Sequence, residues 1–330
     1  MKIIDTLTKV CNSDVSDIHI CSNEPIRIRL DGELKALEDQ VTSAEEVTEF
    51  FTAYLSAKQL EQVNQGIETD ASIEIKDTAR FRINIYHKLS GMAASLRTIR
   101  THSPSLKEIS APPVFLKLTE EKKGLVLVTG PTGCGKSTTL AALIDTINST
   151  KAGHIITIED PIEYIHTNKR CLISQRELGT HTYSFGNALR AALREDPNYI
   201  LVGEMRDLET IQLALTAAET GHLVFATLHT MSAVKTIDRI IDSFPAAQQN
   251  QVRSMLSESL TAVIAQTLCK KPHGGRIPAF EILISTPAVR NLIREGKSHL
   301  IENCLQTGQA LGMQTMESSL RELKNKGVIV

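Results

Sequence analysis

Residues 130–138 constrain this chain most, because they match the phosphate-binding pattern G-x-x-x-x-G-K-[ST] between a short apolar strand and an amphipathic helix. Glycines in such a loop let successive backbone N–H groups converge on phosphates, and the start of the next helix adds partial positive charge. We therefore predict that the chain binds and hydrolyses a nucleoside triphosphate, ATP, at this loop. The predicted nucleotide-binding residues are Gly130, Pro131, Thr132, Gly133, Cys134, Gly135, Lys136, Ser137 and Thr138. Lys136 is expected to reach the β- and γ-phosphates, and the Ser137 hydroxyl to ligate Mg²⁺.

Two further strand-like segments end in acidic residues. Residues 199–203 are mostly apolar and precede Glu204, the pattern of a Walker-B strand whose acid holds Mg²⁺ or its water. An acid at this position is also favourable simply as the start of the next helix. Residues 155–158 precede Glu159, Asp160 and Glu163, and one of these carboxylates is expected to orient water against the γ-phosphate. Spacing alone does not choose among the three, and a solvated acidic turn is the alternative.

Two histidines bracket one more strand, over residues 223–228. His229 follows the carboxyl end of the strand, near the expected γ-phosphate, whereas His222 stands at its start. Each histidine taken alone is more often a hydrogen-bonded structural residue.

The hydrophobic pattern divides the chain into two domains. Beyond residue 113, short apolar strands alternate with longer amphipathic helices, which predicts a mostly parallel sheet with ligands at the carboxyl ends of its strands. Before it, residues 26–30, 73–75 and 79–85 alternate apolar and charged side chains, as half-buried antiparallel strands do, and a helix is expected over 44–65. We predict an α+β domain over 1–102, a proline-containing linker over 103–113, and an α/β P-loop ATPase domain over 114–330.

Composition excludes several classes of protein. The 42% of hydrophobic and 22% of charged residues are typical of a globular chain rather than a disordered one. Lys plus Arg number 36 against 38 Asp plus Glu, so bulk charge predicts binding to neither nucleic acid nor anionic lipid. Neither a secretory signal nor an apolar run of roughly 20 residues is present, so we expect a cytoplasmic protein with no transmembrane segment. Six scattered cysteines without a C-x-x-C pair indicate neither a zinc site nor disulfides.

The boxes described above resemble, in their order and spacing, those of the secretion and pilus ATPase superfamily. From residue 16 to the end, the chain is similar to the type IV pilus retraction branch of that superfamily. The strings that carry this similarity are SDIHI at 16–20, ALREDP at 192–197, VGEMRD at 202–207, LALTAAETGH at 213–222 and MLSESL at 255–260. Residues 288–295, AVRNLIRE, differ at one position from the retraction signature A-I-R-N-L-I-R-E. Extension and secretion relatives usually carry a longer N-terminal region and a four-cysteine zinc module, for which this chain has neither the room nor the cysteine pairs.

The resemblance implies a homohexamer whose subunits have a PAS-like N-terminal domain and a RecA-like motor domain. It implies that ATP and Mg²⁺ bind between the two domains, and that nucleotide state changes the angle between them at the linker. The partner implied is an inner-membrane pilus platform protein, which places the motor at the cytoplasmic face of the inner membrane.

The resemblance also implies roles for single residues. Within the acidic box it assigns Glu163 as the catalytic base; it gives Glu204 to the Mg²⁺ site and His229 to sensing the γ-phosphate. Arginines of the first domain are implied to reach the nucleotide, where a planar guanidinium neutralises transition-state charge. The candidates for this task are Arg82 and Arg97, with Arg80 and Arg100 after them.

Three other functions remain open from the sequence. A type II or IVB secretion ATPase, or a pilus-assembly ATPase, has the same chemistry and another task. A RecA-like nucleic-acid motor is disfavoured by the near-zero charge and by only 4% aromatic residues for base stacking. A nucleotide-binding regulatory module without turnover is disfavoured by the retained carboxylates.

Overall fold

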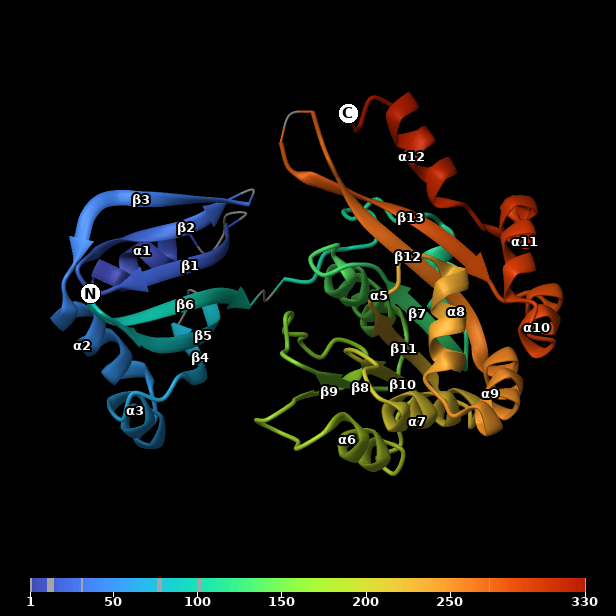
Figure 1. Cartoon of the computed structure of the whole chain (residues 1–330), viewed down its shortest axis with the longest axis horizontal. Helices are drawn as coiled ribbons and strands as arrows, with labels where there is room; N and C mark the ends of the chain where they lie inside the picture. Colours follow the sequence, from blue (N-terminus) through green and yellow to red (C-terminus); the bar gives the residue numbers. More distant parts are fainter. Residues whose placement is uncertain are drawn as a thin grey trace. The chain divides into compact units, whose positions relative to one another are not determined.

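The computed structural model describes residues 2–10, 15–30, 32–75, 79–99, 102–272 and 274–329 (Figure 1). The chain divides into two compact units, Met1–Thr101 and His102–Val330. None of the helices in these described ranges combines the length and the apolar character needed to cross a membrane.

In its described residues, the first unit is a six-stranded antiparallel sheet with three helices, which confirms the predicted α+β class. Its strand order is β3-β2-β1-β6-β5-β4. The strands are β1 (Val15–Cys21), β2 (Glu24–Leu30), β3 (Glu33–Thr42), β4 (Thr69–Ile75), β5 (Ala79–Lys88) and β6 (Gly91–Ile99), and the helices are α1 (Lys2–Val10), α2 (Ala44–Tyr54) and α3 (Ala57–Asn64). Alternate residues of the strands, such as Ile18, Phe81 and Leu96, are buried in one core with Phe50 and Phe51 of α2. The period-2 pattern in the sequence reflects this one-sided burial.

The segment 44–65 is helical, as predicted, and it forms two helices with a break at Leu55 and Ser56. Leu55 has extended backbone angles and ends α2. Ser56 then begins α3 with a capping box: its hydroxyl accepts from the Gln59 N–H, and the Gln59 side chain accepts from the Ser56 N–H. This reciprocal cap satisfies two N–H groups that a helix start otherwise leaves without partners, so a new helix begins there.

The second unit is a seven-stranded sheet in the order β13-β12-β7-β11-β10-β8-β9, parallel except for the antiparallel pair β12–β13. This confirms the predicted α/β class. The strands are β7 (Gly124–Thr129), β8 (His154–Glu159), β9 (Leu172–Glu177), β10 (Tyr199–Val202), β11 (Leu223–Leu228), β12 (Leu260–Lys270) and β13 (Arg276–Ile284). The helices are α4 (Val114–Leu118), α5 (Lys136–Thr150), α6 (Phe185–Ala192), α7 (Leu208–Glu219), α8 (Ala233–Asp242), α9 (Ala246–Ser259), α10 (Pro287–Arg294), α11 (Ile301–Thr307) and α12 (Met316–Asn325).

Helices cover both faces of this sheet (Figure 1). On one face, Val126, Val128 and Phe225 pack with α4 and α5. On the other face, residues such as Leu127 and Ile200 pack with α6 to α11. Burial on both faces explains why the strands are continuously apolar, since every residue of β7 and β11 is buried.

Residues 103–113, predicted as a linker, belong to the second unit. Ile109 is buried, and Leu106 and Ala111 pack against the core beside α4 and α5. The prolines keep this stretch out of regular helix or strand, and its apolar side chains nevertheless hold it on the unit.

Candidate active site

The glycine-rich loop lies between β7 and α5, as predicted from the sequence. Gly130, Gly133 and Gly135 all have positive φ angles, 143°, 77° and 89°. At Gly130 a side chain is also sterically excluded, because a Cβ atom would lie 2.4 Å from the backbone oxygen of Gln266. These glycines therefore give the loop a backbone path that other residues do not follow.

The buried side-chain amide of Gln266 holds this loop in place. Gln266 on β12 donates from Nε2 to the backbone oxygen of Cys134 at 2.6 Å, and its Oε1 accepts from the Thr139 hydroxyl at 2.8 Å. The Cys134 side chain is buried as well, and burial raises the pKa of its thiol. Sequence reasoning missed Gln266, which is far from the loop in sequence and belongs to no motif.

The charged and hydroxyl side chains of the loop, those of Lys136, Ser137 and Thr138, lie at the start of α5. The Lys136 Nζ donates to the backbone oxygens of Gly130 at 2.9 Å and Pro131 at 3.1 Å, so the ammonium lies across the loop. Ser137 is partly buried in the first turn of α5. The Thr138 hydroxyl is 3.0 Å from the hydroxyl of Tyr164, which joins the loop to the acidic box.

The carboxyl ends of β8, β10 and β11 bring the predicted Walker-B acid and histidine together. The Glu204 side chain is only 13% exposed; its Oε1 pairs with Arg206 at 2.5 Å, and its Oε2 lies 3.4 Å from the His229 Nε2. Arg206 also approaches the Asp160 carboxylate at 3.6 Å. Asp207 has a structural task, because its carboxylate caps α7 by accepting from the backbone and hydroxyl of Thr210.

The three acids of the acidic box have different surroundings. Glu159 is the most enclosed: its Oε1 accepts from the Thr157 hydroxyl at 2.6 Å and from the Gln175 Nε2 at 3.3 Å. Burial raises the pKa of Glu159 to about 7 against those hydrogen bonds, and the nearby charge of Glu163 adds to the rise. Asp160 faces Arg206, whereas Glu163 is exposed. Among the described residues no cation pairs with Glu163, and an unpaired carboxylate open to solvent is the better suited of the three to take a proton from water.

The edge strand β9 fixes the loop that carries Glu163. Gln175 donates from Nε2 to the Tyr164 backbone oxygen at 2.9 Å and accepts from the His166 N–H at 2.8 Å. Glu177 accepts from the Ile162 N–H at 3.1 Å. Backbone on both sides of Glu163 is therefore anchored to one strand.

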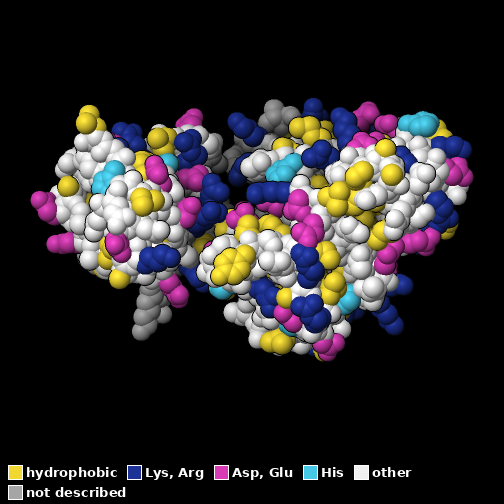
Figure 2. All heavy atoms as spheres, turned by 60° about the horizontal axis from the view of Figure 1, so that its bottom comes forward, with side chains coloured by type: hydrophobic (Ala, Val, Ile, Leu, Met, Phe, Trp, Pro, Cys, Tyr) yellow, Lys and Arg dark blue, Asp and Glu magenta, His cyan; other side chains and the backbone are white. Residues whose placement is uncertain are grey.

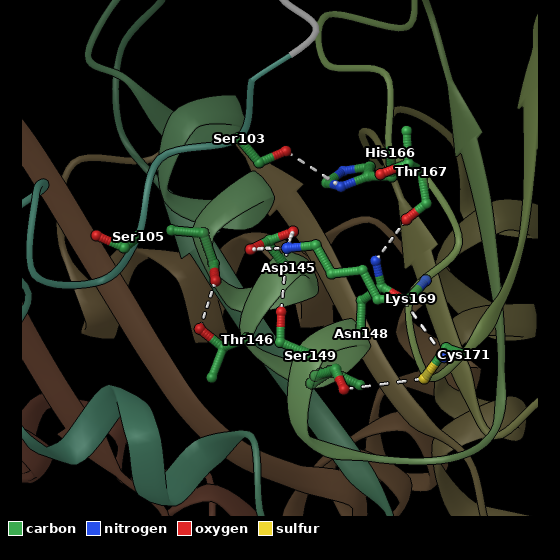
Figure 3. Close-up of polar contacts among 12 residues, drawn as sticks. Ser103, Ser105, Asp145, Thr146, Asn148, Ser149, His166, Thr167, Lys169 and Cys171 are labelled. Atoms are coloured by element: carbon green, nitrogen blue, oxygen red, sulfur yellow. Dashed lines mark hydrogen bonds and ion pairs between the residues drawn. The ribbon is translucent and has the colours of Figure 1, made fainter.

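Residues 166–169, which lead from the acidic box toward β9, are anchored on α5 (Figure 3). The fully buried Asn148 donates from Nδ2 to the Thr167 oxygen at 2.8 Å and accepts from the Lys169 N–H at 3.0 Å. The Lys169 ammonium pairs with Asp145 of α5 at 2.7 Å. His166 lies 3.2 Å from the Ser103 hydroxyl, and burial lowers the pKa of this histidine to about 4.

His222 is not part of this constellation. It precedes β11, at the end of the strand opposite His229, and its Nδ1 lies 2.9 Å from the Ala217 oxygen and 3.3 Å from the Thr220 hydroxyl. Both partners belong to the end of α7 and the turn after it, so the ring helps to hold that turn.

The candidate arginines lie on the sheet of the first unit. Arg82 of β5 and Arg97 of β6 are directly opposite in the antiparallel register. Arg97 pairs with Asp17 at 2.9 Å; burial opposes ionisation of Asp17, and the bonds from Arg97 and Ser16 outweigh it and lower the pKa of that carboxyl. Arg80 donates to the Ser72 hydroxyl at 3.0 Å. Arg100 lies outside the described residues.

The segment 288–295 lies mostly in α10, which Thr286 caps. Val289 and Ile293 are buried in the core, and Arg294 pairs with Glu258 of α9. Core packing therefore accounts for the apolar half of this signature.

The comparisons with known proteins show the family to which the chain belongs. The sequence model of the family "Type II/IV secretion system protein" matches residues 1–314. A "Twitching motility protein" of Neisseria gonorrhoeae is 57% identical over 303 residues, which cover 92% of this chain and 81% of that protein. A "Type IV pilus retractation ATPase PilT" of Pseudomonas aeruginosa is 51% identical over 329 residues, which cover 100% of this chain and 96% of that protein. Among solved structures, that of "the Pilus Retraction Motor PilT and Bound ADP" has a TM-score of 0.91 at 45% identity, covering 100% of this chain and 95% of the other.

Proposed function

Because this chain belongs to the type II/IV secretion system protein family, we propose that it is an ATP-hydrolysing motor that powers type IV pilus retraction. The observation that carries this proposal is the 51% identity, over 100% of the chain, to a protein described as a pilus retraction ATPase. Two features of the structure support it: the glycine loop follows β7, and the Glu204 Oε2 lies 3.4 Å from the His229 Nε2 at the same edge of the sheet.

Each candidate residue has its own role in hydrolysis. Backbone N–H groups of the glycine loop and the Lys136 ammonium bind the β- and γ-phosphates. Glu163 orients a water molecule and accepts its proton as the water oxygen attacks the γ-phosphorus and the bond to ADP breaks. His229 senses the γ-phosphate from the end of β11. Arg82 and Arg97 of the first unit neutralise charge in the transition state.

The donor set fits Mg²⁺ rather than a metal held by protein alone. Within the described ranges, His, Cys, Asp and Glu form no group of three able to hold a metal ion. Mg²⁺ in phosphoryl-transfer sites needs only one or two protein ligands, because water and phosphate oxygens supply the rest. Ser137 and Glu204 would hold it, and when bound it neutralises charge on the phosphates.

The assembly proposed is a homohexamer that acts on an inner-membrane pilus platform protein from the cytoplasmic face of that membrane. Nucleotide state sets the angle between the two units, and cycling around the ring drives the platform. We propose that nucleic acid is not its substrate. A nucleic-acid motor needs a basic track, and on the one face drawn in Figure 2 acidic and basic side chains are interspersed.

The first test is steady-state ATP hydrolysis by the purified wild type and Glu163→Gln, with mass measured in the same buffer. We expect magnesium-dependent turnover by a six-subunit species. Removing the base should lower kcat by about a hundredfold or more while ADP binding persists. A monomer that binds ATP and never turns it over would favour the regulatory module instead.

The pilus task needs a test in cells. A strain whose only retraction ATPase is Lys136→Ala or Glu204→Ala should assemble pili and fail to retract them. Retraction at the wild-type rate in that strain would rule out this chain's ATPase activity as the power source.

A further inference from the structure

Gln266 is a buried polar residue whose side chain contacts the glycine loop. Its side chain is 2% exposed, and it follows Ala265, the last residue of β12 that pairs with β7. Its amide reaches two places at once, the Cys134 backbone oxygen and the Thr139 hydroxyl. An amide at this depth has both of its polar ends satisfied by the loop and by the helix after it.

The chemistry of the partners fixes which end of the amide faces the loop. The Cys134 carbonyl oxygen only accepts, so the NH₂ group of Gln266 must point toward it. The Gln266 oxygen then faces Thr139, whose hydroxyl is able to donate. This amide therefore has one orientation in which both contacts are hydrogen bonds.

The hydrogen bond to Cys134 also sets the direction of the next N–H group. In a planar trans peptide, C=O and N–H point to opposite sides, so the Gly135 N–H is directed away from Gln266. Gly135 has φ of 89° and precedes the first turn of α5. Within the part of the chain that the structure describes, no protein group accepts a hydrogen bond from this N–H.

We propose that Gln266 is a positioning residue for the nucleotide, because it orients the Cys134–Gly135 peptide so that the Gly135 N–H donates to phosphate. The proposal rests on the nucleotide site proposed above. Glycine at 135 allows either sign of φ on the far side of this peptide, so a bond from outside the loop helps to select one orientation. Without that bond, the loop would spend part of its time with the N–H turned away from the ligand.

The test separates the two ends of the amide by titrating ADP, with Mg²⁺, into wild type and variants by calorimetry. Gln266→Met loses both contacts and adds no charge. Gln266→Glu keeps an acceptor for Thr139 and loses the donor to Cys134, and because it also adds a carboxyl beside the phosphates it is compared with Gln266→Met. We expect each to weaken ADP binding by about five- to tenfold. Thr139→Val removes only the other partner and should stay within about threefold. Gln249→Met is the matched control, because its half-buried amide donates to the Phe244 oxygen at 3.2 Å, between α8 and α9.

Kinetics distinguish positioning of the ligand from general damage. The orientation of one phosphate-binding N–H affects ground and transition states alike, so KM for ATP should rise while kcat at saturation stays within about twofold. The midpoint of thermal unfolding without nucleotide verifies that each variant is folded.

The outcomes also distinguish this inference from the function on which it rests. Wild type that bound no ADP would overturn the nucleotide site and the inference with it. Wild type that bound ADP, with folded Gln266→Glu and Gln266→Met binding it equally well, would overturn the role of Gln266 alone. Equal losses in Thr139→Val and Gln266→Met would overturn it too, because the bond to Cys134 would then not be the one that matters.

Discussion

Replacing Glu159 by glutamine should stabilise the folded second unit in a pH-dependent way. Burial raises the pKa of this carboxyl from 4.5 to about 7, so the folded protein holds a proton that the unfolded chain releases. Glutamine resembles the protonated acid, and its amide oxygen still accepts from the Thr157 hydroxyl and the Gln175 amide. The substitution therefore removes the cost of a buried charge without removing its hydrogen-bond partners.

The sign and size follow from linkage. Between about pH 4.5 and 7 the folded state binds more protons than the unfolded state, so the free energy of unfolding of the wild type falls as pH rises. Above about pH 7 the loss is complete. The two pKa values of Glu159 differ by about 2.5, and at about 1.4 kcal/mol for each pKa unit the full cost is about 3 kcal/mol. Most of this titration lies between about pH 5 and pH 8. Over that interval, the free energy of unfolding of Glu159→Gln should rise by about 2–3 kcal/mol relative to that of the wild type.

The assay is urea unfolding without nucleotide, followed by far-UV circular dichroism because the chain has no tryptophan. The transition of the second unit is identified as the one that ADP shifts upward. Glu120→Gln, which alters an exposed carboxyl of the same unit, is the matched control and should leave the difference from wild type constant with pH. A Glu159→Gln protein whose advantage was the same at both pH values would refute the reasoning.

Two further predictions concern residues that act from outside the glycine loop. Gln175→Met removes the bonds to the Tyr164 oxygen and the loop beyond it, so kcat should fall about tenfold or more, with KM for ATP within about twofold; an unchanged kcat would show that the loop needs no such anchor. Arg82→Ala and Arg97→Ala should each lower kcat by about a thousandfold, and lysine at the same position should not restore it; an unchanged kcat would exclude that arginine from the site. Arg97 is exposed and its partner Asp17 is half-buried, so loss of this pair should change stability by only about 1 kcal/mol, and circular dichroism separates a catalytic from a folding effect.

The part of the site that the sequence predicted is the part built by local patterns. A strand followed by glycines, lysine and serine specifies a phosphate loop within a few residues, and the structure places it between β7 and α5. Glu204 and His229 lie 25 positions apart, yet each follows a strand of one parallel sheet. Because parallel strands end at the same edge, two separate motifs predict one location.

The part that the sequence did not predict depends on contacts between distant positions. Gln266 reaches Cys134 across 132 positions, and nothing in the spacing of a glutamine on a strand marks it as a loop anchor. Gln175 likewise stands on an edge strand with no motif around it. The break between α2 and α3, by contrast, could have been predicted locally. Ser56 and Gln59 match the capping-box pattern, but the helical periodicity continues across it.

The two glutamines occupy corresponding places in the sheet. The strand order places β12 with Gln266 and β9 with Gln175 on either side of β7, β11, β10 and β8, the four strands that carry the nucleotide motifs. A neutral amide suits such places because it donates and accepts at once, fixing backbone of either polarity. It also adds no net charge beside a ligand that carries several, whereas a buried ion would shift every nearby pKa and favour one phosphate state over another. Fixed charge is then kept for side chains at the carboxyl edge such as Lys136 and Glu204, which we propose act on the nucleotide.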